Sequence, residues 1–371
     1  MIKFATTGNV LKNENVYLKD ITLTHFKNYT AQSVRFSPHL NCFVGLNGMG
    51  KTNLLDAIYY CCIGKSYFAG SDRNLVQQGS EGGFFRLEAA FCRQDKLERV
   101  VVKVIPGKRK EIARNQVVYT RISEHLGLLP VVMIAPFDVR LALEGSEARR
   151  KFLDATLSQL QPAYLQQLIQ YNRLLQQRNA LLKRFAEQRS FDATLLRTYD
   201  AQLVPLGQFI YTSRKTFLEE FQSTFQHYYR LIASEQEQVD YRYLSKLDHY
   251  SFEDLLQGAV EKDRVLQRTT VGIHKDDIDF RINRTPVKRF ASQGQLKSFI
   301  LALKLAQYQL MRQHKGLPPI LLLDDIFDKL DQQRVQQLLQ LLLEQDFGQI
   351  FITDTDEHRV QQIVQAFDKD Y

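Results

Sequence analysis

The chain has 371 residues and a formal net charge of +8, so it is long enough for two or three lobes, and its charge favours acidic partners such as nucleic acid. Its four cysteines have neither metal-ligand spacing nor the pattern of a disulfide framework, which indicates a reducing compartment. No stretch approaches the roughly 18 apolar residues of a membrane span, and the polar residues 1–15 do not resemble a signal peptide. We therefore expect a cytosolic protein.

The first third of the chain alternates between loose and strand-forming sequence. Residues 1–15 predict a loose tail, because their Thr-, Gly- and Asn-rich sequence buries little apolar surface. The apolar pattern predicts strands within residues 17–44, and again over 82–104 and 131–134. The basic stretch 107–110 is interpreted as a turn between strands, either solvated or in contact with a phosphate.

A glycine-rich loop follows the first group of strands and carries the strongest signal in the chain. Its residues are Gly45, Leu46, Asn47, Gly48, Met49, Gly50, Lys51 and Thr52, with Asn53 directly after them. In this G-x-x-x-x-G-K-T pattern the backbone N–H groups converge on phosphates, Lys51 neutralises the β- and γ-phosphates, and the Thr52 hydroxyl binds Mg²⁺. Apolar residues at helical spacing come next, so a helix N-terminus faces the phosphates. The pattern predicts a nucleoside triphosphate site.

Between residues 147 and 237 glycine nearly disappears and the apolar spacing becomes helical. One heptad seam contains Leu165, Leu168, Leu175 and Leu182, with Asn172 and Asn179 on the same side. The seam covers fewer than three heptads, which favours a packed helical lobe over a coiled coil. The basic residues that could contact DNA here are Arg149, Arg150, Lys151, Lys183 and Arg184. The alternative, which is stronger for each of them, is an exposed solubilising charge.

A long helix is predicted from about residue 294 to 313, after a strand at 277–282. The helix opens with Ser292, Gln293, Gly294 and Gln295. Taken alone, Ser-x-x-Gln is a capping box. A capped helix N-terminus with a nearby glycine can also bind an anion. Because the chain's own triphosphate already lies on another helix, such a site would suit the γ-phosphate held by a partner subunit.

An apolar run at residues 320–323 ends in two acids, Asp324 and Asp325. A carboxylate at the tip of a buried strand can support Mg²⁺, and the next acid can orient or deprotonate the attacking water. Together with the phosphate loop, this pattern predicts a Walker B strand. Residues 328–331, which end in Asp331, follow where ABC-type ATPases have a D-loop that touches the opposite subunit.

Several stretches together resemble the RecF family of bacterial DNA replication and repair proteins. They are residues 23–29 (LTHFKNY), 45–53 (GLNGMGKTN), 64–68 (GKSYF), 134–138 (IAPFD), 149–154 (RRKFLD), 272–277 (GIHKDD), 290–295 (FASQGQ) and 322–327 (LLDDIF). The RRKFLD and HKDD stretches are distinctive of this family rather than of ATPases in general. The family is similar to the head domains of structural-maintenance-of-chromosomes (SMC) proteins, without their long coiled coils.

The resemblance implies an α/β fold: an ABC-type P-loop ATPase head, with a mixed sheet and helices, plus an α-helical second lobe. The ATPase domain would comprise residues 1–135 and 272–371, and the helical lobe, which contacts DNA or partners, residues 136–271. ATP and Mg²⁺ are the implied ligands, with Lys51 and Asp325 as the catalytic residues. Ser292 and Gly294 of a second copy would complete each ATP site.

The resemblance also implies a role in recombinational repair and replication restart. ATP would drive formation of a homodimer on duplex DNA and on junctions of single- and double-stranded DNA. A weak, DNA-stimulated ATPase would act as the switch that opens the dimer. The implied partners are RecR and RecO, which load the RecA recombinase at gapped DNA.

Two positions depart from the wider ATPase pattern. Asp325 stands where many ABC ATPases have glutamate, and Thr355 occupies the switch-histidine position, so we expect slow hydrolysis. The glutamine-loop residue is either Gln77 or Asp138. Two other classes stay open: the nucleotide-binding subunit of a membrane transporter, which would usually carry histidine in place of Thr355, and a small-molecule P-loop kinase, against which the capped signature helix argues.

Overall fold

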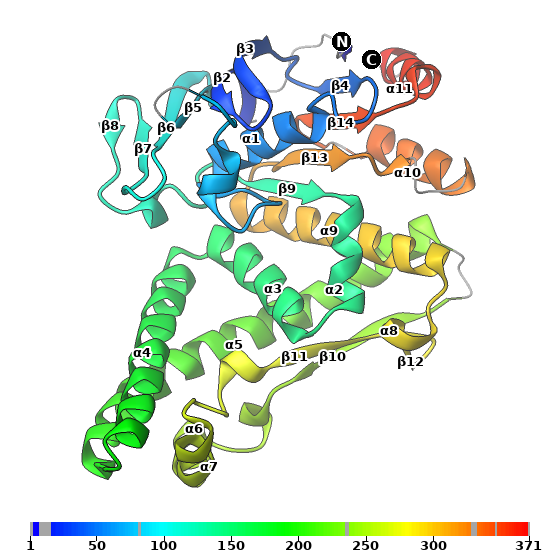
Figure 1. Ribbon diagram of the computed structural model, residues 1–371. Helices are drawn as coiled ribbons and strands as arrows, with labels where there is room; N and C mark the ends of the chain where they lie inside the picture. The colour runs from blue at the N-terminus through cyan, green and yellow to red at the C-terminus, as the bar shows by residue number, and fades with distance from the viewer. Residues whose placement is uncertain are drawn as a thin grey trace. The chain divides into compact units, whose positions relative to one another are not determined.

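The computed structural model (Figure 1) describes residues 3–6, 16–80, 83–233, 237–327, 332–345 and 347–369. The chain divides into two compact units. Unit 1 comprises Met1–Val139, His227–Glu235 and Gln293–Tyr371, and unit 2 comprises Arg140–Gln226 and Gln236–Ser292. These units differ from the expected domains: residues 136–139 and 227–235 belong to unit 1, and residues 272–292 belong to unit 2. None of the described helices has the length and apolar character needed to cross a membrane.

Unit 1 contains two sheets. The first has the order β1-β4-β14-β13-β9, in which β1 is antiparallel to β4 and the other neighbours are parallel. The second is antiparallel throughout, in the order β3-β2-β5-β6-β7-β8. The strands of the first sheet are β1 (Lys3–Thr6), β4 (Leu40–Val44), β9 (Val131–Ile134), β13 (Ile320–Asp324) and β14 (Ile350–Asp354). Those of the second are β2 (Val16–Phe26), β3 (Tyr29–Arg35), β5 (Phe85–Arg93), β6 (Lys96–Val104), β7 (Glu111–Arg114) and β8 (Val117–Val118).

The sequence patterns of the two sheets differ because their burial differs. Every residue of β4, β9, β13 and β14 is buried, which matches the unbroken apolar runs of parallel strands covered on both faces. In β6, buried positions alternate with more exposed ones over most of the strand, as expected when one face meets solvent. The predicted strands at residues 131–134 and 320–323 are thereby confirmed.

Helix α1 (Lys51–Ile63) packs against strands of both sheets, and it is buried from Leu54 to its end. A helix that is apolar on all sides suits this position between two layers (Figure 1). The other helices of unit 1 include α9, which packs on β9, and α11, which packs on β1 and β4. Their bounds are α9 (Gln293–Lys315), α10 (Gln332–Glu344) and α11 (Glu357–Lys369).

The expectation of a loose tail at residues 1–15 is wrong for one segment. Strand β1 pairs with the edge of β4, with Lys3 opposite Val44 and Thr6 opposite Asn41. The composition of the segment did not predict this, because pairing depends on the open backbone groups of the neighbouring edge strand. Residues 7–15 lie outside the described part of the chain.

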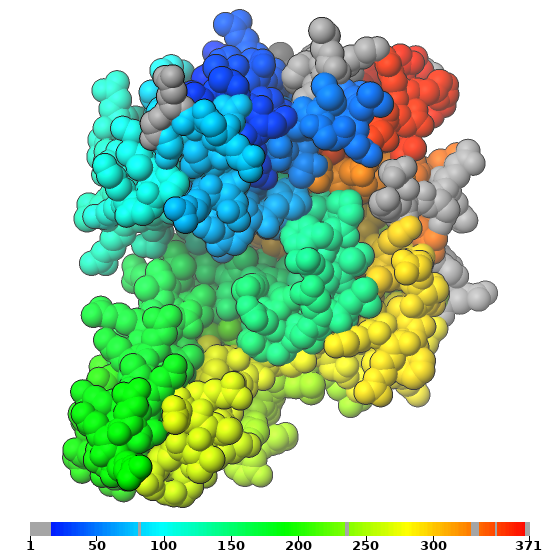
Figure 2. Space-filling view, viewed as in Figure 1, coloured from blue at the N-terminus to red at the C-terminus, as the bar shows by residue number. Residues whose placement is uncertain are grey.

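Unit 2 is largely helical but also contains a small sheet, which the expected helical lobe lacked. Strands β10 (Val239–Leu244), β11 (Asp277–Ile282) and β12 (Thr285–Pro286) form an antiparallel sheet in that order. Helices α4 and α7 pack side by side (Figure 2). The helices are α2 (Arg140–Leu143), α3 (Ser146–Leu160), α4 (Pro162–Glu187), α5 (Ala193–Ile232), α6 (Phe252–Gly258), α7 (Val260–Leu266) and α8 (Val287–Phe290). The last residues of α5 are assigned to unit 1.

The leucine seam that the sequence predicts on α4 coincides only in part with the buried face of this helix. Among the predicted seam residues, Leu182 is buried, whereas Asn172 is exposed. The buried face contains Tyr164, Tyr171, Leu174, Arg178, Leu181, Leu182 and Phe185. A heptad pattern based on leucines could not identify this face, because it also contains an arginine and two tyrosines.

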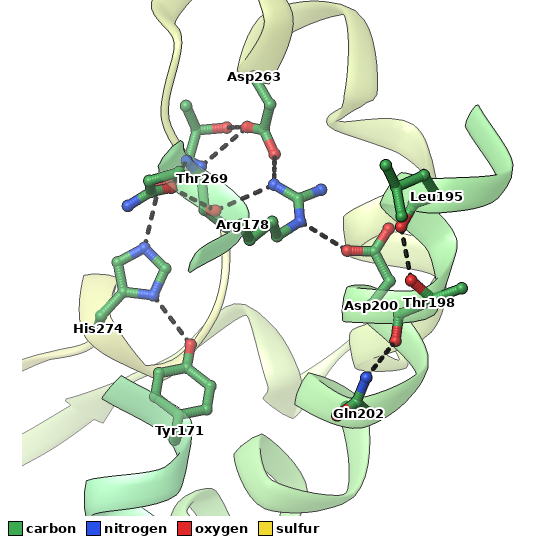
Figure 3. Close-up of polar contacts among 11 residues, drawn as sticks. Tyr171, Arg178, Leu195, Thr198, Asp200, Gln202, Asp263, Thr269 and His274 are labelled. Carbon is green, nitrogen blue, oxygen red and sulfur yellow. Dashed lines mark hydrogen bonds and ion pairs between the residues drawn. The ribbon is translucent and has the colours of Figure 1, made fainter. Parts of the chain in front are cut away.

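Arg178 lies at the centre of a buried polar cluster in unit 2 (Figure 3). Its Nε donates to Asp200 Oδ1 and its Nη1 to Asp263 Oδ2, both at 2.6 Å. Nη1 also donates to Thr269 Oγ1 at 3.0 Å. One guanidinium therefore joins α4, α5, α7 and the segment after α7.

Replacing Arg178 with methionine is expected to destabilise the protein by about 3–5 kcal/mol, because Asp263 would keep its buried charge without its counterion. Thermal and urea unfolding measure the effect. The matched control is Arg173→Met, which removes an exposed arginine from the same helix. Equal unfolding midpoints for the two variants would show that the cluster does not hold unit 2 together.

Candidate functional site

The phosphate loop joins β4 to α1, as its sequence predicts. Gly48 and Gly50 have φ angles of 81° and 100°, a region that residues with a side chain rarely adopt. Helix α1 begins at Lys51, so the unpaired N–H groups of its first turn lie at the loop. Together with the helix dipole, these groups form an anion-binding geometry.

Two residues of the β2–β3 region brace this loop. The Tyr29 hydroxyl donates to the carbonyl of Gly50 at 3.0 Å, and Asn28 Nδ2 donates to the carbonyl of Met49 at 3.4 Å. Asn53 Nδ2 donates to Asn28 Oδ1 at 2.8 Å. A Cβ atom at Gly50 would lie 2.5 Å from Asn28 Nδ2, so a larger residue there would displace the Asn28 side chain as well as strain the backbone. The contact of Asn28 and Tyr29 with the loop could not be predicted from the sequence, because it depends on the packing of separate strands.

The ammonium group of Lys51 lies over the loop. Its Nζ donates to the carbonyl oxygens of Gly45 and Leu46, at 2.5 and 3.0 Å. The residue is largely buried, whereas Leu46 on the outside of the loop is 77% exposed. The lysine charge is therefore held at the position where the phosphate loop curls, as its predicted role requires.

A hydrogen-bonded cluster joins the loop to the end of β13. The Thr52 hydroxyl donates to Asp324 Oδ1 and Oδ2, at 2.9 and 3.1 Å. The Thr353 hydroxyl, on the neighbouring strand β14, donates to Asp324 Oδ1 at 2.9 Å and accepts the backbone N–H of Asp325 at 2.9 Å. The structure thus brings Thr52, Asp324 and Asp325 together, although the threonine and Asp324 are 272 residues apart in the sequence. Sequence reasoning missed Thr353, which contacts both acids.

The pKa of Asp324 and the backbone conformation of Asp325 reflect their positions at the end of β13. Burial raises the pKa of Asp324, and the neighbouring Asp325 adds to the rise, while hydrogen bonds from Thr353 and Thr52 and the charge of Lys51 oppose it. Asp325 has a φ of 49°, a left-handed conformation that aspartate tolerates better than most residues. A cation at this place would favour the ionised carboxylates. The oxygen donors of Thr52 and Asp324 are the ligand type that Mg²⁺ prefers.

The signature residues lie at the start of α9. Ser292 is exposed and directly precedes the helix, while Gln293, Gly294 and Gln295 form its first turn. The Arg334 side chain packs against this turn: a Cβ at Gly294 would lie 3.0 Å from Arg334 Nη1, and Arg334 Nε donates to Ser298 Oγ at 2.7 Å. The D-loop residue Asp331 lies outside the described residues.

Thr355 stands at the switch-histidine position, and Gln77 and Asp138 are the two candidates for the glutamine-loop residue. The backbone N–H of Thr355 donates to Asp354 Oδ1 at 2.6 Å, which fixes the turn after β14. Gln77 Nε2 donates to Thr30 Oγ1 at 2.8 Å. Asp138 is buried, accepts hydrogen bonds from the Tyr67 hydroxyl and the backbone N–H of Ala135, and lies 3.6 Å from Lys304 Nζ. These contacts give Asp138 a structural role within unit 1.

Residues 17–369 match the model of the RecF/RecN/SMC N terminal domain. A DNA replication and repair protein RecF from Flavobacterium johnsoniae is 44% identical over 356 residues, 96% of this chain and 99% of that protein. One from Parabacteroides distasonis is 41% identical and covers 95% of each chain. The chain belongs to the RecF family.

Solved structures of RecF agree with this assignment. The recombination mediator RecF bound to ATP superposes with a TM-score of 0.86 and 29% identity, covering 92% of this chain and 93% of that one. The RecF–ATPrS complex gives a TM-score of 0.85 and 28% identity, with 93% and 94% covered. The Smc head domain from Pyrococcus furiosus is 17% identical with a TM-score of 0.55, which shows a shared fold; 95% of this chain and 92% of that one are covered. The predicted ABC-type head fold is confirmed.

The RRKFLD stretch turns out to be partly structural. Arg149 is buried and forms a bidentate ion pair with Asp277, with N···O distances of 2.6 and 3.0 Å. It also donates to the carbonyl oxygens of Leu141 and Glu144. The expectation that Arg149 contacts DNA is therefore wrong, because its donors are used inside unit 2.

The other four basic residues are more accessible. Arg150 is half-buried, and its Nη1 donates to the Asp276 carbonyl at 2.7 Å. Lys151 is exposed and forms an ion pair with Glu147 one helical turn away, a contact of small energetic value. Lys183 and Arg184 are exposed on α4. For these four residues DNA contact stays a prediction.

His274, in the HKDD stretch, is held neutral inside unit 2 (Figure 3). Its Nε2 lies 3.1 Å from the Thr269 carbonyl and its Nδ1 lies 2.9 Å from the Tyr171 hydroxyl. A carbonyl only accepts, so Nε2 carries the proton and Nδ1 accepts the tyrosine O–H. Burial lowers the pKa of His274 to about 4, and the positive charges of Lys275 and Arg150 contribute to this fall.

This histidine should make stability depend on pH. In the unfolded chain His274 is protonated below about pH 6.5, whereas in the folded chain it stays neutral down to about pH 4. Between these two values the unfolded state binds more protons, so the folded state loses stability as the pH falls. Glutamine at this position can keep both hydrogen bonds but does not titrate. The stability advantage of the wild type over His274→Gln should therefore shrink by roughly 3 kcal/mol between pH 7.5 and pH 4.

Urea unfolding of the two proteins across this pH range measures the difference. Burial raises the pKa of Asp276 to about 6, which shifts stability in the opposite direction, but this residue is common to both proteins. A difference between wild type and variant that does not change with pH would contradict a neutral His274.

Proposed function

We propose that the chain is an ATP-dependent DNA-binding switch of recombinational DNA repair and replication restart. The observation that carries the proposal is the cluster of Thr52, Asp324 and Thr353, because it joins the phosphate loop to the acid pair at one site. The relatives support it as well, since they are named DNA replication and repair proteins and RecF has been solved with ATP.

The contacts of the phosphate loop and of the end of β13 support these roles within the ATP site. The loop N–H groups and Lys51 bind the phosphates, and Thr52 and Asp324 would hold Mg²⁺. When bound, Mg²⁺ neutralises charge on the phosphate oxygens during transfer. Asp325 orients the attacking water and accepts its proton. The aspartate side chain is one methylene shorter than glutamate, and Thr355 takes the place of a histidine, so turnover is slow and suits a switch.

The site is completed by a second copy of the chain. Ser292 is exposed at the N-terminus of α9, where a helix end can receive a γ-phosphate. Ser292 and Gly294 of one copy then face the ATP held by the other. Two ATP molecules hold the dimer closed, and hydrolysis opens it.

The closed dimer binds duplex DNA and the junctions between single and double strands. The RecF solved with ATP is a recombination mediator protein of the RecFOR pathway. By analogy, this chain acts with RecR- and RecO-type mediators to load a recombinase at gapped DNA. Its DNA-stimulated ATPase limits the lifetime of the complex.

Fluorescence anisotropy with labelled duplex and gapped duplex tests the proposal. We expect binding with ATP and Mg²⁺, weak binding with ADP, and an affinity that falls steeply between about 50 and 200 mM salt, as phosphate contacts require. Binding that is equal with ATP and ADP would contradict the switch. Binding that is flat with salt would contradict a phosphate-backbone interface.

A further inference from the structure

Three basic residues lie in or beside one short turn of unit 2. The turn is the 3₁₀ helix Ile273–Lys275, which carries Lys275 at its end. Arg150 reaches it from α3, because its Nη1 donates to the carbonyl of Asp276 at 2.7 Å. Arg268 lies beside the turn in the segment after α7: the carbonyl of the next residue, Thr269, is 3.1 Å from His274 Nε2, and the charge of Arg268 is close enough to lower the pKa of Lys275. We call Arg150, Arg268 and Lys275 the basic cluster.

The acids closest to the turn already have hydrogen-bond or ion-pair partners inside unit 2. Asp276 accepts a hydrogen bond from the Tyr243 hydroxyl at 2.5 Å and lies 3.5 Å from Arg214 Nη1. Asp277 forms the bidentate ion pair with Arg149. Asp263 binds Arg178 and the backbone N–H of Thr270. Each of these carboxylates thus has an internal partner, whereas Arg268 and Lys275 are exposed.

The basic cluster rests on a rigid frame. Figure 3 shows His274 between the Tyr171 hydroxyl and Thr269, with Thr269 in turn bound to Arg178. Asn179 Oδ1 also accepts from the N–H of Thr269 at 2.7 Å. The backbone that carries Arg268 and Lys275 is therefore fixed by buried hydrogen bonds. A fixed frame lowers the entropy cost of ordering the two side chains on a ligand.

Holding like charges together is unfavourable unless an anion joins them. Partial burial lowers the pKa of Lys275, and the positive charges of Arg268 and Arg150 lower it further. Burial also lowers the pKa of Arg150, with Arg214 as the next cause. A phosphate between these side chains would reverse the repulsion and supply several acceptor oxygens.

We propose that Arg150, Arg268 and Lys275 bind backbone phosphates of duplex DNA. This inference rests on the proposed function, and it names the residues that make the contact. The basic cluster does not distinguish DNA sequences, because contacts of lysine and arginine with phosphates carry no direct sequence information. Arg150 is the one member of the basic cluster that was also among the five residues predicted from the sequence to contact DNA.

The test compares duplex binding by the wild type and by the double variant Arg268→Ala/Lys275→Ala, in ATP and Mg²⁺, from about 50 to 250 mM salt. The matched control is Arg197→Ala/Lys246→Ala, which removes one arginine and one lysine from elsewhere in unit 2. We expect the cluster variant to bind about tenfold more weakly at roughly 150 mM salt, with the slope of log K against log salt smaller by about 2. The control should keep the wild-type slope, and both variants should keep the wild-type ATP affinity.

The outcomes separate this inference from the proposed function. If the wild type binds no duplex DNA, the proposed function fails and the basic cluster fails with it. If the wild type binds and the two double variants lose affinity equally, the DNA contact lies elsewhere and only the cluster is refuted. A lower affinity with an unchanged salt slope would also refute it, because no phosphate contact would have been lost.

Discussion

Replacing Lys51 with methionine is expected to weaken ATP binding by about 100-fold or more, because the side chain would keep its length but lose the charge that faces the β- and γ-phosphates. In the structure the ammonium group donates to carbonyl oxygens of its own loop. We therefore expect little change in the unfolding midpoint. Titration with a fluorescent ATP analogue measures the affinity.

The matched control for this variant is Lys96→Met, which removes an exposed lysine of unit 1 at the start of β6. It should bind ATP as the wild type does. An affinity of Lys51→Met close to that of the wild type would show that the triphosphate does not bind at this loop.

Asp325→Asn is expected to slow ATP hydrolysis by about 100- to 1,000-fold while ATP binding is retained, because asparagine can still orient a water but cannot accept its proton. The backbone N–H of residue 325 would keep its bond to Thr353, so the turn should be preserved. The ATP-bound form should accumulate. Phosphate release measures the rate, and nucleotide titration measures the binding.

An exposed aspartate of the β5–β6 hairpin provides the control, since Asp95→Asn changes the charge of unit 1 by the same amount. Its hydrolysis rate should match that of the wild type. If Asp325→Asn hydrolysed ATP at a rate within a few-fold of the wild type, another residue would have to serve as the base.

Sequence patterns predicted the elements whose structure depends on residues close together in the chain. The strand before the loop, helix α1 and strand β13 follow from apolar runs and from the glycine pattern, and the structure confirms all three. Strands were predicted from apolar patterns within residues 17–44 and over 82–104, but neither β7 and β8 nor the order of the antiparallel sheet was predicted. Strand β1 was missed because it forms on the open edge of β4, which a segment's own composition does not reveal.

The site was predictable where one motif carried it and unpredictable where two distant segments meet. Lys51, Thr52 and Asp324 were expected from their motifs, and the hydrogen bonds of Thr52 to Asp324 connect those motifs. Thr353 was missed because a threonine in a buried strand carries no recognisable pattern. Arg149 was misjudged for a related reason: its partner Asp277 is 128 residues away.

If one ATP is held by two copies of the chain, nucleotide binding must change the mass of the protein in solution. Light scattering should show that ATP converts the wild type and the control Ser190→Arg from monomer to dimer. Ser292→Arg should stay a monomer with unchanged ATP affinity, because the new side chain blocks the partner's phosphate site. A Ser292→Arg protein that dimerised with ATP as readily as the wild type would contradict the account.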